Sequence, residues 1–196
     1  MSTSHNSRKL AGEARVDPAV RTIRTVTVDD HLIVRSECPQ DFAAIRLVNE
    51  AAFGRRDEAD LVDALRDESA MLHSFVAERA RQIVGHALFS RLFIEAGGGP
   101  VAAVALAPVA VLPANQGAGI GAQLIHHGLN RLREDGEKIV LVLGEPRYYA
   151  RFGFSAEKAQ RLITPFPPES YMALEFSSAA LNGIHGRVRY AAAFGL

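Results

Sequence analysis

The sequence has 196 residues, 48% of them hydrophobic, which is enough for one domain with its own core. Its 22 basic and 22 acidic side chains balance, so no long-range field favours nucleic acid or an anionic membrane as a partner. Cys38 stands alone, which excludes an internal disulfide framework, and no apolar stretch is long enough to span a membrane. Because the N-terminus also lacks the apolar core of a signal peptide, we expect a cytoplasmic protein.

The first 29 residues are polar, mixed in charge and without sustained periodicity. We interpret residues 1–29 as a mobile N-terminal leader, in which residues 22–28 could add an edge strand, and residues 30–196 as the single folded domain. A better strand is predicted at residues 31–35.

Two helices are predicted after this strand. Pro39 suits the first turn of one of them, and Gly54 ends it. Asp57 is expected to cap the second helix, with Asp60 three residues further on.

The middle of the chain predicts a run of antiparallel strands. Residues 73–78 and 83–90 surround a polar turn, which by length and pattern predicts an antiparallel hairpin. A glycine-rich turn at 97–100 then leads into an apolar strand at 104–111. Pro108 in this strand cannot donate to a ladder, so it belongs at an edge or at a bulge; the apolar character of both faces favours a buried bulge.

The stretch that organises the sequence runs from this strand through a glycine-rich turn, residues 116–121, into a helix that Gly136 ends. One face of the helix is apolar at 3.6-residue spacing. Its members are Ile120, Leu124, Ile125, Leu129 and Leu132.

Such a turn is suited to bind an anion. The first-turn amides of a helix lack intrahelical partners and carry the positive end of the helix dipole, and Gly117, Gly119 and Gly121 have no Cβ to keep a phosphate away. A phosphate or pyrophosphate site is therefore predicted, although a tight turn without a ligand is the competing interpretation. The ATP-binding P-loop needs Gly-Lys followed by Ser or Thr, where this sequence has Gly121-Ala122-Gln123, and the GxGxG spacing differs from the GxGxxG dinucleotide motif.

A further strand is predicted at 138–144, and a short helix follows it. Pro146 fits the first turn of that helix and Gly153 its end, so that Tyr148 and Tyr149 lie within it. Residues 171–176 are expected to form a late strand, and residues 182–190 a closing one.

Two motifs together resemble the GNAT family of N-acetyltransferases: Gln116-x-x-Gly119-x-Gly121 directly after a strand, and Tyr149 four residues before Gly153-Phe154. The stretches LAPVAVLPANQGAGIG, LVLGEPRYYARFGF, YMALEF and GRVRYAAAF resemble the YhbS-like subgroup, and the resemblance covers residues 32–194. It implies an α/β (α+β) GNAT fold, with a central mixed, mostly antiparallel sheet that is splayed between strands 4 and 5 and flanked by helices. IVGHALFS resembles the third strand of the family, in which a small residue such as Gly85 leaves room in the sheet.

The resemblance also implies the residues of the site. Acetyl-CoA would bind to the strand before the turn and to the turn itself, and a backbone N–H near Val109 or Ala110 would hold the carbonyl oxygen. The implied cofactor-binding residues are Val109, Ala110, Val111, Gln116, Gly117, Ala118, Gly119, Ile120 and Gly121.

Tyr149 is the expected hydrogen-bond donor to the leaving sulfur, because a phenol with a pKa of roughly 10 gives up its proton to a thiolate only uphill. Tyr148 is expected to pack in the core. For a general base we choose Glu58 from the acids near the acceptor side, where helix capping and solvated surface are the competing roles. The other acids considered are Glu50, Asp57, Asp60 and Glu145.

Several features bear on how the site differs from the family pattern. Ala118 stands where the family often has a cation, and the link after the fifth strand offers no asparagine for the cofactor. His126 and His127 point about 100° apart on their helix, which argues against a shared metal. Because the sequence has no His/Cys/Asp cluster either, we predict no metal. His86 is interpreted as a packed histidine rather than as a substrate contact.

The function that follows is acetyl-CoA-dependent transfer of an acetyl group to a primary amine of a small molecule or peptide. One alternative is a non-catalytic sensor module that binds acyl-CoA, and another is a phosphate-binding interaction domain unrelated to coenzyme A. The sequence predicts no nucleic-acid or membrane partner and leaves a homodimer open.

Overall fold

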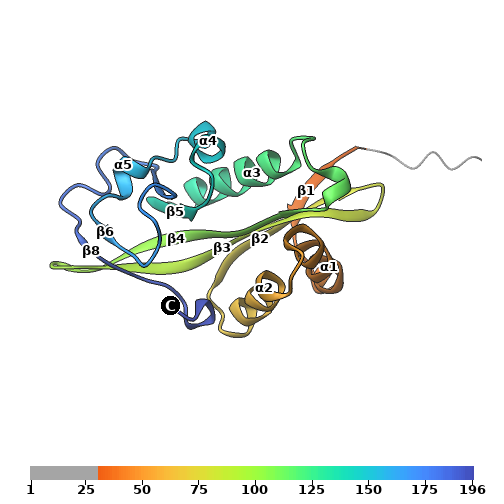
Figure 1. Cartoon of the computed structure of the whole chain (residues 1–196), viewed down its shortest axis with the longest axis horizontal. Coiled ribbons are helices and arrows are strands. Elements are labelled where there is room, and N and C mark those ends of the chain that lie inside the picture. Colours follow the sequence, from red (N-terminus) through yellow and green to blue (C-terminus); the bar gives the residue numbers. More distant parts are fainter. Residues whose placement is uncertain (1–30) are drawn as a thin grey trace, which may run out of the picture.

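The computed structural model describes residues 31–196, so the predicted leader and its edge strand lie outside the described residues. An eight-stranded sheet crosses the molecule and carries helices on both faces (Figure 1). The strands are β1 (Ile33–Ser36), β2 (Met71–Arg79), β3 (Gln82–Ala96), β4 (Gly99–Val111), β5 (Ile139–Leu143), β6 (Leu162–Ile163), β7 (Tyr171–Glu175) and β8 (Gly186–Arg189). The helices are α1 (Phe42–Phe53), α2 (Asp57–Asp67), α3 (Ile120–Glu134), α4 (Pro146–Tyr149) and α5 (Ala156–Ala159), with short 3₁₀ turns at Pro39–Asp41, Pro113–Asn115, Ala150–Phe152 and Ala192–Phe194.

The main path of the sheet has the order β1-β2-β3-β4-β5-β7. Neighbours along this path are antiparallel except for β4 and β5, which are parallel. The predicted closing strand is present as β8, but it pairs with the far end of β3 and with the short β6. The mixed, mostly antiparallel sheet is therefore confirmed.

β4 and β5 separate soon after they meet. Their ladder has only the pairs Val104–Val140 and Ala105–Leu141, although both strands continue beyond them. Against β3, the register of β4 shifts between the pairs Phe89–Leu106 and Ala87–Val109. This shift places one extra residue in β4 at positions 107–108, so Pro108 lies in a bulge, as predicted.

α3 packs on one face of the sheet, and α1 and α2 pack on the other (Figure 1). The apolar face of α3 is buried as its spacing predicts. Glycine allows this close approach: a Cβ at Gly128 would lie 2.1 Å from the ring of Phe89, and one at Gly85 would lie 3.0 Å from Ile120 and Leu124. The prediction that Gly85 leaves room in the sheet is confirmed.

The predicted cap of α2 is wrong. Arg56 occupies the N-cap position with near-helical backbone angles (φ −95°, ψ −13°), and no side chain caps the helix there. Since Asp57 already lies within the first turn, its carboxylate cannot take the capping position and instead lies 3.6 Å from Arg55.

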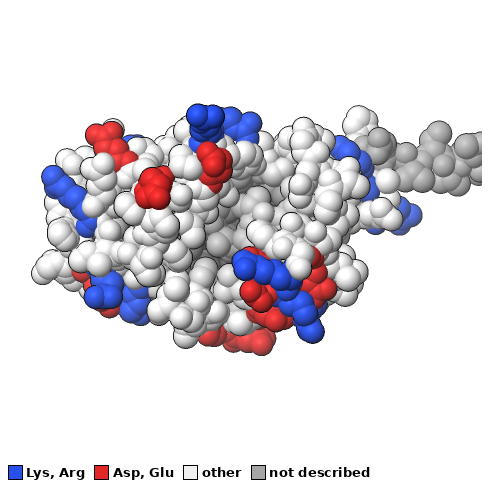
Figure 2. Space-filling model, in the orientation of Figure 1, with Lys and Arg blue, Asp and Glu red and all other residues white. Residues whose placement is uncertain are grey.

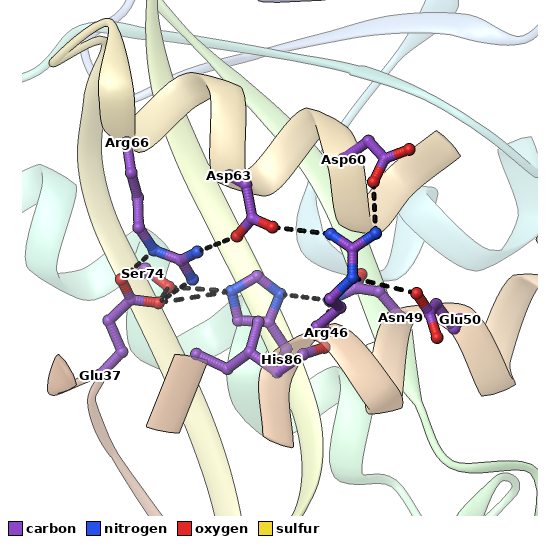
Figure 3. Close-up of polar contacts among 10 residues, drawn as sticks. Glu37, Arg46, Asn49, Glu50, Asp60, Asp63, Arg66, Ser74 and His86 are labelled. Carbon is purple, nitrogen blue, oxygen red and sulfur yellow. Dashed lines mark hydrogen bonds and ion pairs between the residues drawn. The ribbon is translucent and has the colours of Figure 1, made fainter. Parts of the chain in front are cut away.

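A buried polar network ties α1 and α2 to the sheet (Figure 3). Asn49 of α1 donates to His86 Nδ1 at 3.1 Å, so His86 carries its proton on Nε2, which donates to Ser74 at 2.8 Å. The Ser74 hydroxyl donates in turn to Glu37. Asn49 and His86 are fully buried, which confirms that His86 is a packed residue.

Ion pairs extend this network along α2. Arg66 makes two bonds to Glu37, at 2.8 and 2.9 Å, and one to Asp63 at 2.7 Å. Asp63 also accepts from Arg46 of α1 at 2.7 Å. Burial disfavours the charge on Glu37, but the bonds from Arg66 and Ser74 hold its pKa below the ordinary value. The network therefore fixes both helices against β1, β2 and β3.

Burial lowers the pKa of His86 to about 3. An unfolded chain binds this proton below a pH of roughly 6.5, whereas the folded protein does not. The contribution of neutral His86 to the free energy of unfolding should therefore be complete above that pH. It should decline as the pH falls, by up to about 1.4 kcal/mol per pH unit. We expect urea unfolding between pH 6.5 and 5 to show this slope, and His86→Leu to be less stable but to lose it.

The exposed His126 of α3 provides the matched control, since His126→Gln should keep the slope of the natural protein. A natural protein whose stability stays level between pH 6.5 and 5 would contradict the prediction.

Candidate functional site

The glycine turn, residues 116–121, joins β4 to α3 in the conformation that the sequence indicates. Gly117 and Gly119 have positive φ angles of +77° and +79°, and nothing lies within 4 Å of a Cβ built at either. Gln123 is the first residue of α3 whose backbone N–H donates a hydrogen bond to the turn, to the carbonyl of Gly119 at 3.1 Å. The amides of the preceding helical residues remain available as donors for an anion.

A cleft of about 380 Å³ opens at this turn and is called the glycine cleft below. β4 and the glycine turn form one side of it, and residues of the α4 segment form the other. The residues that line it are Val109, Val111, Asn115, Gln116, Gly117, Gly119, Ile120, Gly121, Ala122, Tyr148, Tyr149 and Arg151.

Seven of the nine predicted cofactor-binding residues line the glycine cleft, and Ala110 and Ala118 do not. The alternation of β4 explains Ala110, because its buried side chain lies on the sheet face opposite to Val109 and Val111. Gln116 lines the cleft, but its side-chain amide donates to the carbonyl of Val111 at 3.0 Å. The Gln116 side chain therefore links the glycine turn to the end of β4 through this hydrogen bond.

Arg151 is a cleft residue that the sequence analysis missed. Its guanidinium lies 4.4 Å from the ring centroid of Tyr148, and its Nε donates to the Tyr148 carbonyl at 3.2 Å. Arg151 is the only charged residue among those lining the glycine cleft. The spacing of three residues from Tyr148, which puts both on one face of a helical turn, was the signal that could have found it.

Tyr148 also departs in part from the prediction that it packs in the core. It does pack against the core, yet it also lines the glycine cleft, where its hydroxyl lies 2.9 Å from the position that a Cβ at Gly121 would take. Gly121 therefore makes room for this hydroxyl beside the first turn of α3.

A second cavity, of about 470 Å³, lies where β4 and β5 separate, and it is called the splay pocket below. Its walls come from β4 and β5, from the facing ends of α1 and α2, and from the C-terminal part of the described chain. Tyr149 lines both the splay pocket and the glycine cleft. It therefore stands where the two cavities meet.

The position of Tyr149 depends on Gly144. A Cβ at Gly144 would lie 2.3 Å from the Tyr149 ring, so the glycine leaves the space that the ring fills. Burial, with a smaller effect of Tyr148, raises the pKa of Tyr149 to about 12. Its hydroxyl therefore keeps its proton at neutral pH and can act as a hydrogen-bond donor.

Glu58 is the one predicted acid that lines the splay pocket. Its carboxylate accepts two bonds from Arg55, one of them from Nε at 3.0 Å. The other acids have different partners or positions: Glu50 and Asp60 pair with Arg46, Asp57 is exposed, and Glu145 caps α4 by accepting from the amide of Arg147. The structure thus brings Glu58 and Tyr149 to one cavity.

The described residues offer neither a metal site nor a membrane span. No cluster of three or more His, Cys, Asp or Glu side chains within residues 31–196 could hold a metal ion. None of the helices in that range combines the length and the apolar character needed to cross a bilayer.

Comparisons with known proteins cover both motifs of the site. A family model described as "Acetyltransferase (GNAT) domain" matches residues 34–156. The Escherichia coli (strain K12) protein "Uncharacterized N-acetyltransferase YhbS" is 32% identical over 162 residues, which make up 81% of this chain and 96% of that protein. "Uncharacterized N-acetyltransferase YjhQ" from the same strain is 40% identical over 134 residues, or 66% of this chain and 74% of that protein.

Two solved structures are also similar over most of their length. A GNAT family acetyltransferase from Brucella melitensis in complex with acetyl-CoA has 40% sequence identity and a TM-score of 0.71, covering 84% of this chain and 99% of that one. YhbS from Escherichia coli in complex with CoA has 30% identity and a TM-score of 0.77, covering 93% and 97%.

The close fit of Tyr149 against Gly144 can be tested without a ligand. Gly144→Ala should lower the free energy of unfolding by about 1–3 kcal/mol, because the added methyl overlaps the buried ring. Gly97→Ala is the matched control, since a Cβ there meets nothing within 4 Å. Urea unfolding of the two variants would decide, and equal stability would show that the ring is not confined as described.

Proposed function

Since the chain belongs to the GNAT family and is an acetyl-CoA-dependent acetyltransferase, we propose that it transfers the acetyl group directly to a primary amine of a small molecule or peptide. The observation that carries this proposal is the place of Tyr149 at the meeting of the glycine cleft and the splay pocket. Acetyl-CoA bound in the glycine cleft and an amine bound in the splay pocket would meet beside the Tyr149 hydroxyl.

The residues of the glycine cleft fit acetyl-CoA. Pyrophosphate would accept bonds from the first-turn amides of α3, over the open space at Gly117 and Gly119. The amide-bearing arm of the cofactor would pair with the β4 edge at 109–111, which has no partner strand on its β5 side within the described chain. Ala118 would contribute only backbone, and Arg151 would supply the cation that Ala118 lacks.

Acetyl-CoA supplies an acyl group on a thiol leaving group. Glu58 would accept the proton that the amine loses, directly or through a water, because only a neutral amine attacks a thioester. A backbone N–H of β4 near Val109 or Ala110 would donate to the carbonyl oxygen. Counted from the neutral amine, one carbon–nitrogen bond forms and one carbon–sulfur bond breaks. Nitrogen loses one proton to Glu58, which passes it to solvent, and the leaving sulfur takes up one proton.

Tyr149 would donate a hydrogen bond to the departing sulfur. Its pKa of about 12 lies roughly 3.5 units above that of a cysteine-like thiol, so complete proton transfer would cost about 5 kcal/mol. The phenol therefore stabilises the developing charge, and the sulfur takes its proton later from solvent.

The role of Tyr149 can be tested by following thiol release from acetyl-CoA with a panel of primary amines. Tyr149→Phe should lower kcat about 100-fold while the Kd for acetyl-CoA changes little, because the hydroxyl acts on the leaving group. Cofactor binding without amine-dependent release in the natural protein would favour the non-catalytic sensor instead.

The glycine turn is tested by acetyl-CoA binding, measured by calorimetry. Gly119→Glu should raise the Kd at least 100-fold, because it places a carboxylate beside the pyrophosphate. Gly119→Asn is the control, since asparagine tolerates the left-handed conformation and adds no charge, and its loss should be severalfold. Unchanged binding by Gly119→Glu would remove the turn from the cofactor site.

Arg151→Gln should raise the Kd for acetyl-CoA about tenfold at low salt, since one charge-assisted bond to a phosphate is lost. Arg147→Gln on the neighbouring turn is the control, because Arg147 is exposed and lies outside the glycine cleft. Adding Ala118→Arg to Arg151→Gln should recover part of the affinity. If both arginine variants bind equally well, Arg151 does not contact the cofactor.

A further inference from the structure

The splay pocket is apolar on nearly all sides. Phe53 and Leu61 line it from α1 and α2, Leu143 from the end of β5, and Phe166 and Phe194 from the later part of the chain. Phe53 and Leu143 remain 40% and 43% exposed. They offer apolar area that an occupant could bury.

The charged side chains of the splay pocket are limited to one ion pair. Arg55 and Glu58 are the only charged side chains among its lining residues, and they bond to each other. On the face that Figure 2 shows, charged side chains gather over α1 and α2 and beside α4, with uncharged atoms between the two groups. Glu58 is therefore the one carboxylate side chain in the lining, which is too few for an acceptor with several ammonium groups.

An aromatic cluster holds the far wall in place. The Tyr190 ring lies 4.8 Å from the Phe194 ring and 5.9 Å from the Phe166 ring, measured between centroids. The Tyr190 hydroxyl is 2.8 Å from the Tyr171 hydroxyl, so its polar end is already satisfied. The wall thus presents ring faces and edges to the cavity, which suit an aromatic or aliphatic group.

We propose that the acceptor is a primary amine carried on an apolar group of aromatic size, and that Phe53 and Leu143 select it. This inference rests on the proposed function and names its substrate class. The apolar group lies against the aromatic wall, and the amine points toward Tyr149 and Glu58. A polyamine or an amino sugar is disfavoured, because its further polar groups would lose water without gaining partners.

The apolar walls also assist the reaction. An ammonium group that leaves water for an apolar cavity loses solvation, which lowers its pKa and increases the neutral fraction that can attack. Once the amine is neutral, the single carboxylate of Glu58 has to take up only the one proton that nitrogen loses when the amide forms. Selection of the substrate and activation of the nucleophile would follow from the same lining.

The test compares kcat/KM for amines with saturating acetyl-CoA, using full-length protein. Across propylamine, butylamine, pentylamine and hexylamine, we expect a rise of about threefold to fourfold for each added methylene. 2-Phenylethylamine should exceed ethanolamine and spermidine by at least 100-fold. A flat alkylamine series, or a preference for ethanolamine or spermidine, would overturn the proposal.

Phe53→Ala and Leu143→Ala test the selecting residues. Each should lower the ratio of kcat/KM for 2-phenylethylamine to that for propylamine about tenfold. Phe53→Asp should lower the ratio of kcat/KM for 2-phenylethylamine to that for 1,4-diaminobutane. Leu47→Ala is the matched control, because Leu47 is 65% exposed on the same helix α1 and lies outside the splay pocket. If the three pocket variants behave like the control, the proposal fails.

Failure of the proposed function has a different signature. If acetyl-CoA binds but no amine in the panel releases thiol, direct transfer to an amine is wrong, and the substrate class falls with it. Amine-dependent release without the apolar preference would overturn the substrate class alone.

Discussion

The two residue pairs that join β4 to β5 end at Ala105 and Leu141, and from there the strands diverge. A parallel ladder in the middle of a sheet normally continues, because unpaired backbone groups in a buried strand carry a cost of desolvation. Pro108 reduces this cost, since it has no N–H to leave unpaired and it lies at the bulge. In the proposed mechanism the amides of the cofactor arm complete the ladder. The opening therefore leaves unpaired backbone groups within the sheet that a ligand could pair with, and both cavities depend on this opening.

The acceptor side depends on a second constraint, the polar network beneath α1 and α2. These helices carry Phe53 and Glu58, yet they touch the sheet through buried polar groups as well as through apolar packing. A buried polar chain is costly if it is broken, and its bonds have directions, so it restricts how the helices can slide on the sheet. Leu65 and its apolar neighbours would allow several arrangements of similar packing. The network from Glu37 to His86 favours one of them, and this arrangement also places Phe53 and Glu58 at the splay pocket.

The sequence predicted best those features that local patterns determine. The glycine turn, the buried face of α3 and the helical turn that carries Tyr149 follow from spacing and from backbone preferences, and the structure has all three. The features it missed depend on distant segments. The strand β8 was predicted, but its pairing with β3, 90 or more residues earlier in the chain, was not. Arg151 faces the glycine turn only because β5 returns α4 to that side. The cap at Asp57 failed because the backbone of Arg56 is already helical, which residue type alone does not reveal.

Arg151 and Tyr149 belong to one short helical segment, and this connection has a consequence for the proposed reaction. The arginine would contact the phosphates of the donor, while the tyrosine, two residues earlier, would contact its sulfur. Gly144 and Gly153 bound the segment and allow it to pack closely, the first by leaving space for the Tyr149 ring and the second through a positive φ angle of +90°. A donor that engages Arg151 would therefore also set the position of the phenol against the thioester. Binding energy from the phosphates, which are remote from the bond that breaks, could in this way be used to position the group that stabilises the leaving sulfur.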